Sequence, residues 1–196
     1  MIADNFMWFP DSSSQKGGES DEVQVEGETT DAWFARKKAF ELSTFGFALK
    51  QSDASVVKGG GGGGDGGRAK FQEFKVDKWV DLASVSLYKA CTLGTRFGTA
   101  MLAVRKVGGN NLLYVQYMFR DVSVTGITWG GGSGDKPPTE TVTFEFEAMG
   151  FQYVQQQPDG RQGKKLLWSW NSKSNKPTLA MDGQPPAPSF LLPTQA

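Results

Sequence analysis

The sequence lacks histidine altogether and has a single cysteine, Cys91, among its 196 residues. Histidine is the side chain best suited to proton transfer near neutral pH, so its absence removes the commonest general acid or base. It also excludes a Ser-His-Asp or Cys-His arrangement within the chain. One cysteine can form neither an intrachain disulfide nor a zinc cluster. We therefore expect no enzymatic activity, no metal site and no cofactor.

The sequence also lacks long apolar runs and a net charge. No stretch of about 18 apolar residues occurs, so no membrane-spanning segment is predicted. Residues 1–6 lack the basic and apolar regions of a secretory signal peptide. Lys plus Arg and Asp plus Glu each number 21, and such a neutral chain offers no general attraction for nucleic acid or anionic membranes. We expect protein partners, assembly in a reducing cytoplasm and, if the chain leaves the cell, export by a dedicated machine.

What the sequence does contain favours a β fold. Hydrophobic residues make up 38% and aromatic residues 12%, which is enough for a core. Alternating apolar and polar residues predict five to seven strands and one helix, hence a β-barrel or two-sheet sandwich with long loops. The strands are expected at residues 5–9, 39–50, 70–79, 97–107, 112–125 and 139–155, with a weak one at 23–25.

One short α-helix is expected over residues 84–93. Ser84 is a good N-cap because its hydroxyl can accept a hydrogen bond from the first turn. Gly94 stands where a left-handed C-cap is wanted. The helix should close one end or side of the β layer.

The chain divides into a domain over residues 1–160 and a C-terminal extension over 161–196. The domain carries an acidic insertion at 11–31 and a glycine-rich loop at 58–68, whose backbone has too much freedom to hold one shape unaided. The extension should hold an edge strand at 166–170 and then an irregular tail. Residues 114–119 are apolar on both faces, so the helix or another subunit should cover that strand.

Three patterns invite a chemical interpretation, and each has a simpler one. Glu145 and Glu147 share a strand face and could act as paired carboxylates, but a solvated face is the better reading. Residues 130–136 resemble a phosphate-binding loop, yet the Gly-Lys-Ser/Thr step into a helix is missing. Cys91 has no histidine to activate it and is read as a small core residue.

Trp168 and Trp170 lie two residues apart on the predicted edge strand, so they share a face. Exposed aromatic side chains at this spacing can stack on sugars or bases. They can equally pack on the barrel or on a neighbouring subunit, which we favour. The adjacent Lys164–Lys165 pair is too short to indicate nucleic acid.

Six segments occur in a characteristic order and spacing: 71–81, 82–94 with its Ala-Cys and closing glycine, 103–109, 114–124, 142–153 and 158–160. Together they resemble the Hcp family of type VI secretion tube proteins. No single motif is diagnostic, and the resemblance covers roughly residues 1–10 and 38–160. Three features depart from the family pattern: a longer acidic stretch at 18–31, Val85 in place of a common proline, and the tail from Arg161 onward.

The resemblance implies a mechanical rather than a catalytic role. Hcp proteins fold as a barrel-like pair of sheets with one helix, and six copies form a ring. Rings stack into the inner tube of a contractile machine, which is assembled in the cytoplasm and then secreted. Expected partners are further copies of the chain, the sheath, baseplate or spike proteins, and effector cargo. A closed ring needs two different faces on each subunit that fit one another.

We expect the ring and stacking contacts to come from glycine-rich and aromatic segments, with residues 58–68 as the stacking loop. Two other functions stay open at this point. One is a tail-tube subunit of a phage-like or extracellular contractile machine. The other is a monomeric β-barrel that binds a sugar or lipid; a hydrolase using the paired carboxylates is remote. The expected contact residues are Lys58, Gly59, Asp65, Arg68, Tyr114, Gln116, Trp129, Trp168 and Trp170.

Overall fold

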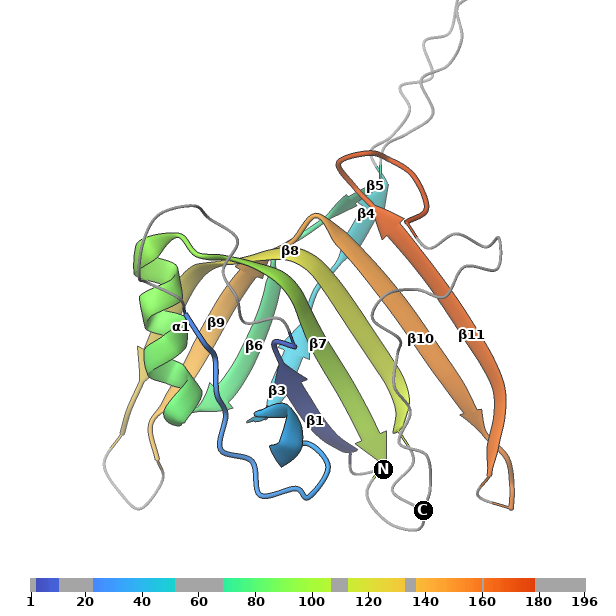
Figure 1. Cartoon of the computed structure of the whole chain (residues 1–196), viewed down its shortest axis with the longest axis horizontal. Coiled ribbons are helices and arrows are strands. Elements are labelled where there is room, and N and C mark those ends of the chain that lie inside the picture. The colour runs from blue at the N-terminus through green and yellow to red at the C-terminus, as the bar shows by residue number, and fades with distance from the viewer. Residues whose placement is uncertain are drawn as a thin grey trace, which may run out of the picture.

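The protein is mainly β with one α-helix, as the alternation in the sequence predicts (Figure 1). The computed structural model describes residues 3–10, 23–51, 69–106, 113–132, 137–159 and 161–178. Within these ranges, no helix is long and apolar enough to span a membrane. The elements are β1 (Ala3–Trp8), the 3-10 turn η1 (Ala35–Lys37), β2 (Phe40–Leu42), β3 (Thr44–Gly46), β4 (Leu49–Gln51), β5 (Ala69–Phe71), β6 (Phe74–Trp79), α1 (Leu82–Leu93), β7 (Arg96–Lys106), β8 (Leu113–Gly130), β9 (Thr139–Glu145), β10 (Ala148–Gln156) and β11 (Gln162–Asn171).

The strands form an antiparallel sheet that returns to its starting point. Its order is β2-β1-β7-β8-β9-β6-β3, and only Ser43 separates β2 from β3. The Ser43 amide donates to the carbonyl of Asp77 on β6, with an N to O distance of 2.8 Å. The two ends of the strand order are therefore one continuous segment, which closes the sheet around a core.

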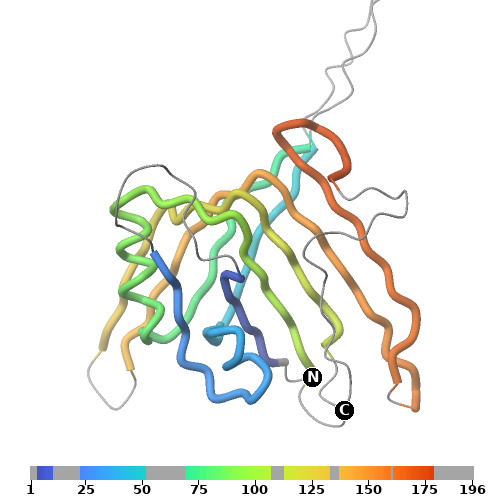
Figure 2. The backbone as a smooth tube through the Cα atoms, viewed as in Figure 1, coloured from blue at the N-terminus to red at the C-terminus, as the bar shows by residue number. Residues whose placement is uncertain are grey.

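Two strand pairs lie outside this closed path. β10 pairs with β8 and β11, so β7, β8, β10 and β11 run side by side as one broad surface, with β11 at its edge (Figure 2). β4 and β5 form a separate two-stranded sheet. The predicted edge strand at 166–170 is thus confirmed and is longer, at Gln162–Asn171.

The long strand β8 shares one of its edges between two partners. Residues 115–120 pair with β10, whereas residues 123–130 pair with β9. Between these stretches Asp121 has φ 54°, a left-handed conformation that aspartate tolerates better than most residues. The amide of Glu147 donates to the carbonyl of Arg120 (3.0 Å), where the chain turns from β9 into β10. The single strand expected at 139–155 is therefore wrong, because one strand cannot follow both halves of a bent partner.

Three other expected strands also need correction. The strand expected at 39–50 is three short strands, and that at 70–79 is two, because the pairing passes from the barrel to the separate β4–β5 sheet. Residues 23–25 form no strand. Val23 and Val25 are nevertheless buried, at 1% and 3% exposure, so the alternation there reflects packing without strand pairing.

Aromatic side chains fill the space inside the barrel. The ring of Phe74 stacks on Phe119 at 4.5 Å and on Phe144 at 5.5 Å between centroids, which joins β6, β8 and β9 across the core. A second apolar cluster lies on the opposite face of β1 and β7, where Phe6 stacks on Phe34 at 3.8 Å. Apolar burial on both faces explains why these strands contain so few polar residues.

Helix α1 begins two residues before the predicted start. Asp81 is the N-cap, and its carboxylate accepts from the Ala83 amide at 2.9 Å. Ser84, predicted as the cap, is instead the third helical residue, and its hydroxyl accepts from the Asp81 amide at 3.0 Å. This reciprocal pair is a capping box, in which a serine can stand at either position. The predicted C-cap at Gly94 is confirmed, with φ 64°.

Arg105 ties the segment before η1 to the barrel. Its guanidinium bonds Asp31 at 2.5 Å and Asp4 at 2.9 Å, and it lies over the Phe34 ring at 5.6 Å. Burial alone would raise the pKa of Asp31. Hydrogen bonds from the Phe34 amide, Arg105 and the Trp33 amide outweigh it, so the pKa is lowered from 3.8.

We expect Asp31→Asn to lower the free energy of unfolding by about 1–3 kcal/mol near neutral pH, because a partly buried, charged hydrogen-bond acceptor is lost. The pKa of Asp31 is lower in the folded state, so its stabilisation is complete above 3.8 and disappears as pH falls through the folded value. Urea titrations near pH 7 and at about pH 3 measure this. The difference in unfolding free energy between wild type and variant should be smaller at about pH 3 than near pH 7. An equal difference at both pH values would contradict the stabilising role of the Asp31 carboxylate.

Candidate subunit interface

One face of the β10–β11 pair carries large apolar side chains that the described chain leaves exposed. Their exposed fractions are 39% for Phe151, 41% for Tyr153, 57% for Leu166 and 53% for Trp168. Phe151 lies opposite Trp168 and Tyr153 opposite Leu166, so all four project to the same side of the strands. We call these four residues the β10–β11 face.

This face continues the interior surface of the barrel beyond its wall. Phe151 stacks on Tyr117 of β8 at 4.9 Å, and Tyr117 in turn meets Phe47 edge-on at 5.0 Å within the core. Burial raises the pKa of Tyr117, with a smaller contribution from Tyr114, so its hydroxyl is neutral at neutral pH. The row Tyr117, Phe151 and Trp168 thus runs from the core to the exposed edge without a charged residue. Such a surface favours contact with another apolar surface.

A second exposed apolar surface lies on α1. Leu82, Val85, Tyr88 and Leu93 are 58%, 72%, 52% and 52% exposed, and Trp129 at the end of β8 is 53% exposed. The rings of Tyr88 and Trp129 meet edge-on at 5.8 Å, which joins the helix to the strand. We call these five residues the α1 face. Helix α1 and strand β11 lie at opposite ends of the view in Figure 1.

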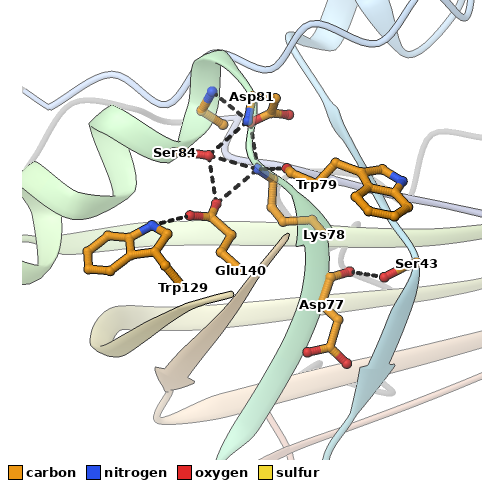
Figure 3. Close-up of polar contacts among 9 residues, drawn as sticks. Ser43, Asp77, Lys78, Trp79, Asp81, Ser84, Trp129 and Glu140 are labelled. Atoms are coloured by element: carbon orange, nitrogen blue, oxygen red, sulfur yellow. Dashed lines mark hydrogen bonds and ion pairs between the residues drawn. The ribbon is translucent and has the colours of Figure 1, made fainter. Parts of the chain in front are cut away.

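A buried polar cluster holds α1 and Trp129 in position (Figure 3). The Lys78 side chain is fully buried, and its ammonium bonds Glu140 at 3.0 Å, Asp81 at 2.6 Å and the Ser84 hydroxyl at 3.1 Å. The Ser84 hydroxyl donates to Glu140 at 2.7 Å, and the Trp129 indole donates to its other oxygen at 2.9 Å. One lysine therefore connects the helix start, β9 and the end of β8.

The predicted contact residues fall into separate places. Trp168 belongs to the β10–β11 face, and Trp129 belongs to the α1 face. Tyr114 is half-buried beside Tyr153, with centroids 6.5 Å apart. Trp170 is also half-buried. Trp129 lies in β8, which extends beyond the strand expected at 112–125.

Gln116 is buried at 2% exposure and accepts from the Gln152 amide at 3.4 Å, so it is an internal contact in this subunit. The four contact residues expected in the glycine-rich loop lie outside the described residues: Lys58, Gly59, Asp65 and Arg68.

The surroundings of Glu145, Glu147 and Cys91 fit a structural role better than a catalytic one. Glu147 sits at the corner between β9 and β10, where it pairs with Arg96 and Lys173, each at 3.2 Å. Glu145 ends β9 and is exposed, so the two carboxylates no longer share a regular strand. Cys91 is half-buried against the barrel core.

Most of the exposed apolar residues were not singled out from the sequence. Phe151 and Tyr153 alternate with Gln152 and Val154, and either set could have faced inward. The decisive information is that β10 pairs with β8 beyond the barrel, which alternation alone does not contain.

Comparison with known proteins decides the family. The sequence model of the family described as "Type VI secretion system effector, Hcp" matches residues 8–153. The chain belongs to the Hcp family. Protein hcp1 of Pseudomonas aeruginosa is 30% identical over 110 residues, which are 55% of this chain and 68% of that protein. Hcp proteins are secreted tube subunits of type VI secretion systems and not an enzyme family, so this chain is a tube subunit.

Solved structures agree on the fold. The chain is similar to one titled "Structure of a type six secretion system protein", with 28% identity and a TM-score of 0.71 over 90% of this chain and all of that one. Hcp1 from Salmonella typhimurium has the same fold, with 24% identity and a TM-score of 0.67 over 91% of this chain.

We expect Lys78→Met to lower the free energy of unfolding by about 3–5 kcal/mol, because it leaves Glu140 buried without its cation. Lys75→Met is the matched control on the same strand. Its pair with Glu73 is more than half exposed, at 57% and 60%, so the loss should stay below about 1 kcal/mol. Urea denaturation of both variants measures the difference, and equal losses would contradict a central role for Lys78.

Proposed function

We propose that six copies of this Hcp protein close into a ring and that rings stack into the tube of a type VI secretion system. The observation that carries the proposal is the β10–β11 face. Four large apolar side chains, each at least 39% exposed, are costly to leave in water. A tube subunit has an obvious use for such a surface, because a neighbouring copy can cover it.

The balance of charges is compatible with association of copies that does not depend on long-range electrostatic attraction. The formal net charge is zero, so copies do not repel one another over long distances. The least exposed ion pairs, those of Lys78 and Arg105, have both partners within the subunit. Contact between copies would therefore depend mainly on apolar burial and shape.

The remaining partners follow from the role of a tube. The sheath would contact the outside of the assembled tube, spike proteins its end, and effector cargo its channel. No catalytic role is proposed for the chain itself. The C-terminal extension after β10 contributes β11, and hence half of the β10–β11 face, so we assign it to ring assembly.

We expect Trp168→Glu to convert rings into monomers, because a charge would be buried at the centre of the contact. Gln157→Glu adds the same charge at the exposed β10–β11 turn and should leave rings intact. Light scattering after size exclusion gives the mass, and negative-stain images of the same peak give the shape. A wild-type chain that is monomeric at high concentration, or a Trp168→Glu variant that still forms rings, would contradict the proposal.

The glycine-rich loop at 58–68 is proposed to mediate stacking between rings. It connects β4 to β5, the strand pair that stands apart from the barrel sheet. Deletion of residues 59–64 should leave the ring mass unchanged and reduce tube formation in negative-stain images. Unchanged tube length and number would show that stacking does not need this loop.

A further inference from the structure

Helix α1 carries four large apolar side chains, beside the polar Lys89 and Thr92, on the side that its own chain does not cover. Ala83, Leu87 and Ala90 are fully buried against the barrel, and Val85 is 72% exposed on the other side. A surface helix normally presents charged and polar residues to water, whereas a helix apolar on all sides is normally covered on all sides. We therefore expect the α1 face to be covered by another protein surface and not by solvent.

We propose that the α1 face of one copy packs against the β10–β11 face of the next. The pairing rests on the proposed ring and specifies its two surfaces. A closed ring with more than two copies needs two different, complementary surfaces on each subunit. The described residues offer two exposed apolar faces, and the elements that carry them, α1 and the β10–β11 pair, lie at opposite ends of the view in Figure 1.

The chemistry of the two faces is matched. Each consists of aromatic and aliphatic side chains about half exposed, so each presents apolar area on the order of a few hundred Å². Trp129 on one face and Trp168 on the other are the side chains most often found at the centre of protein interfaces. Lys89 is also exposed on α1, between Val85 and Leu93, and its long side chain can lie along an apolar contact while its ammonium stays in water.

The buried polar cluster makes the α1 face a fixed surface. Asp81 and Ser84 fix the first turn of α1, and the Trp129 indole donates to Glu140 at 2.9 Å. Lys78 holds these groups from inside the subunit. A surface whose side chains are already positioned loses less conformational entropy when a partner covers it.

If the α1 face binds the β10–β11 face, two variants that are each monomeric should form a dimer when they are mixed. Val85→Glu disables the α1 face, and Trp168→Glu disables the β10–β11 face, so each variant alone should be a monomer. Mixed together, the two variants have one intact face each and should form a dimer of twice the subunit mass, which cannot grow into a ring. Light scattering of each variant and of the mixture at high concentration measures this.

The possible outcomes separate the pairing from the ring itself. Ala35→Glu, at an exposed position of η1, is the control and should retain the wild-type mass. If wild type forms rings and Val85→Glu also does, the pairing is wrong, and the α1 face serves another component of the machine. If both variants are monomers and the mixture contains no dimer, the two faces do not meet.

A monomeric wild type would overturn the ring and the pairing together. A dimer of Trp168→Glu alone would instead indicate contact between two α1 faces.

Discussion

The architecture depends on how β8 distributes its backbone hydrogen bonds. One edge pairs with β7, while the other edge pairs first with β10 and then with β9. The change of partner occurs at Asp121, where the backbone takes a left-handed conformation. Because β9 turns inward to close the barrel and β10 does not, the same strand supports an enclosed core and an exposed sheet. The β10–β11 face exists only because of this division.

The sequence predicts the class of fold well and the connections between strands poorly. Alternation located the apolar stretches, the β7–β8 pair and β11, and Gly94 located the end of α1. Alternation did not reveal that Phe146 and Glu147 form a corner, because apolar residues keep to even positions from Val142 to Ala148. The change of phase comes only afterwards, at Met149, Phe151 and Tyr153. The helix start was displaced for a similar reason. Asp81 and Ser84 both have capping side chains, and only the packing of α1 selects between them.

The contact residues named from the sequence remain a prediction, and the structure places some of them at the surface and others inside. Trp168 and Trp129 were named as contact residues, and both are exposed. Gln116 is buried, because its strand is covered on both faces within one subunit. Val85 drew attention only as a departure from the family pattern, although it is the most exposed large apolar residue of the described chain, at 72%. Exposure depends on which face of α1 meets the barrel, and residues far away in sequence decide that.

The burial of Lys78 and Glu140 has a consequence for a protein that leaves one solution and enters another. Dissolved ions screen charges at a surface but reach a fully buried pair very little. Apolar contacts, in contrast, are maintained or strengthened by most excluded salts. A subunit with this ion pair fully buried and with largely apolar contact faces would keep its shape and its contacts over a wide range of ionic strength. That property suits a tube built in one compartment and used in another.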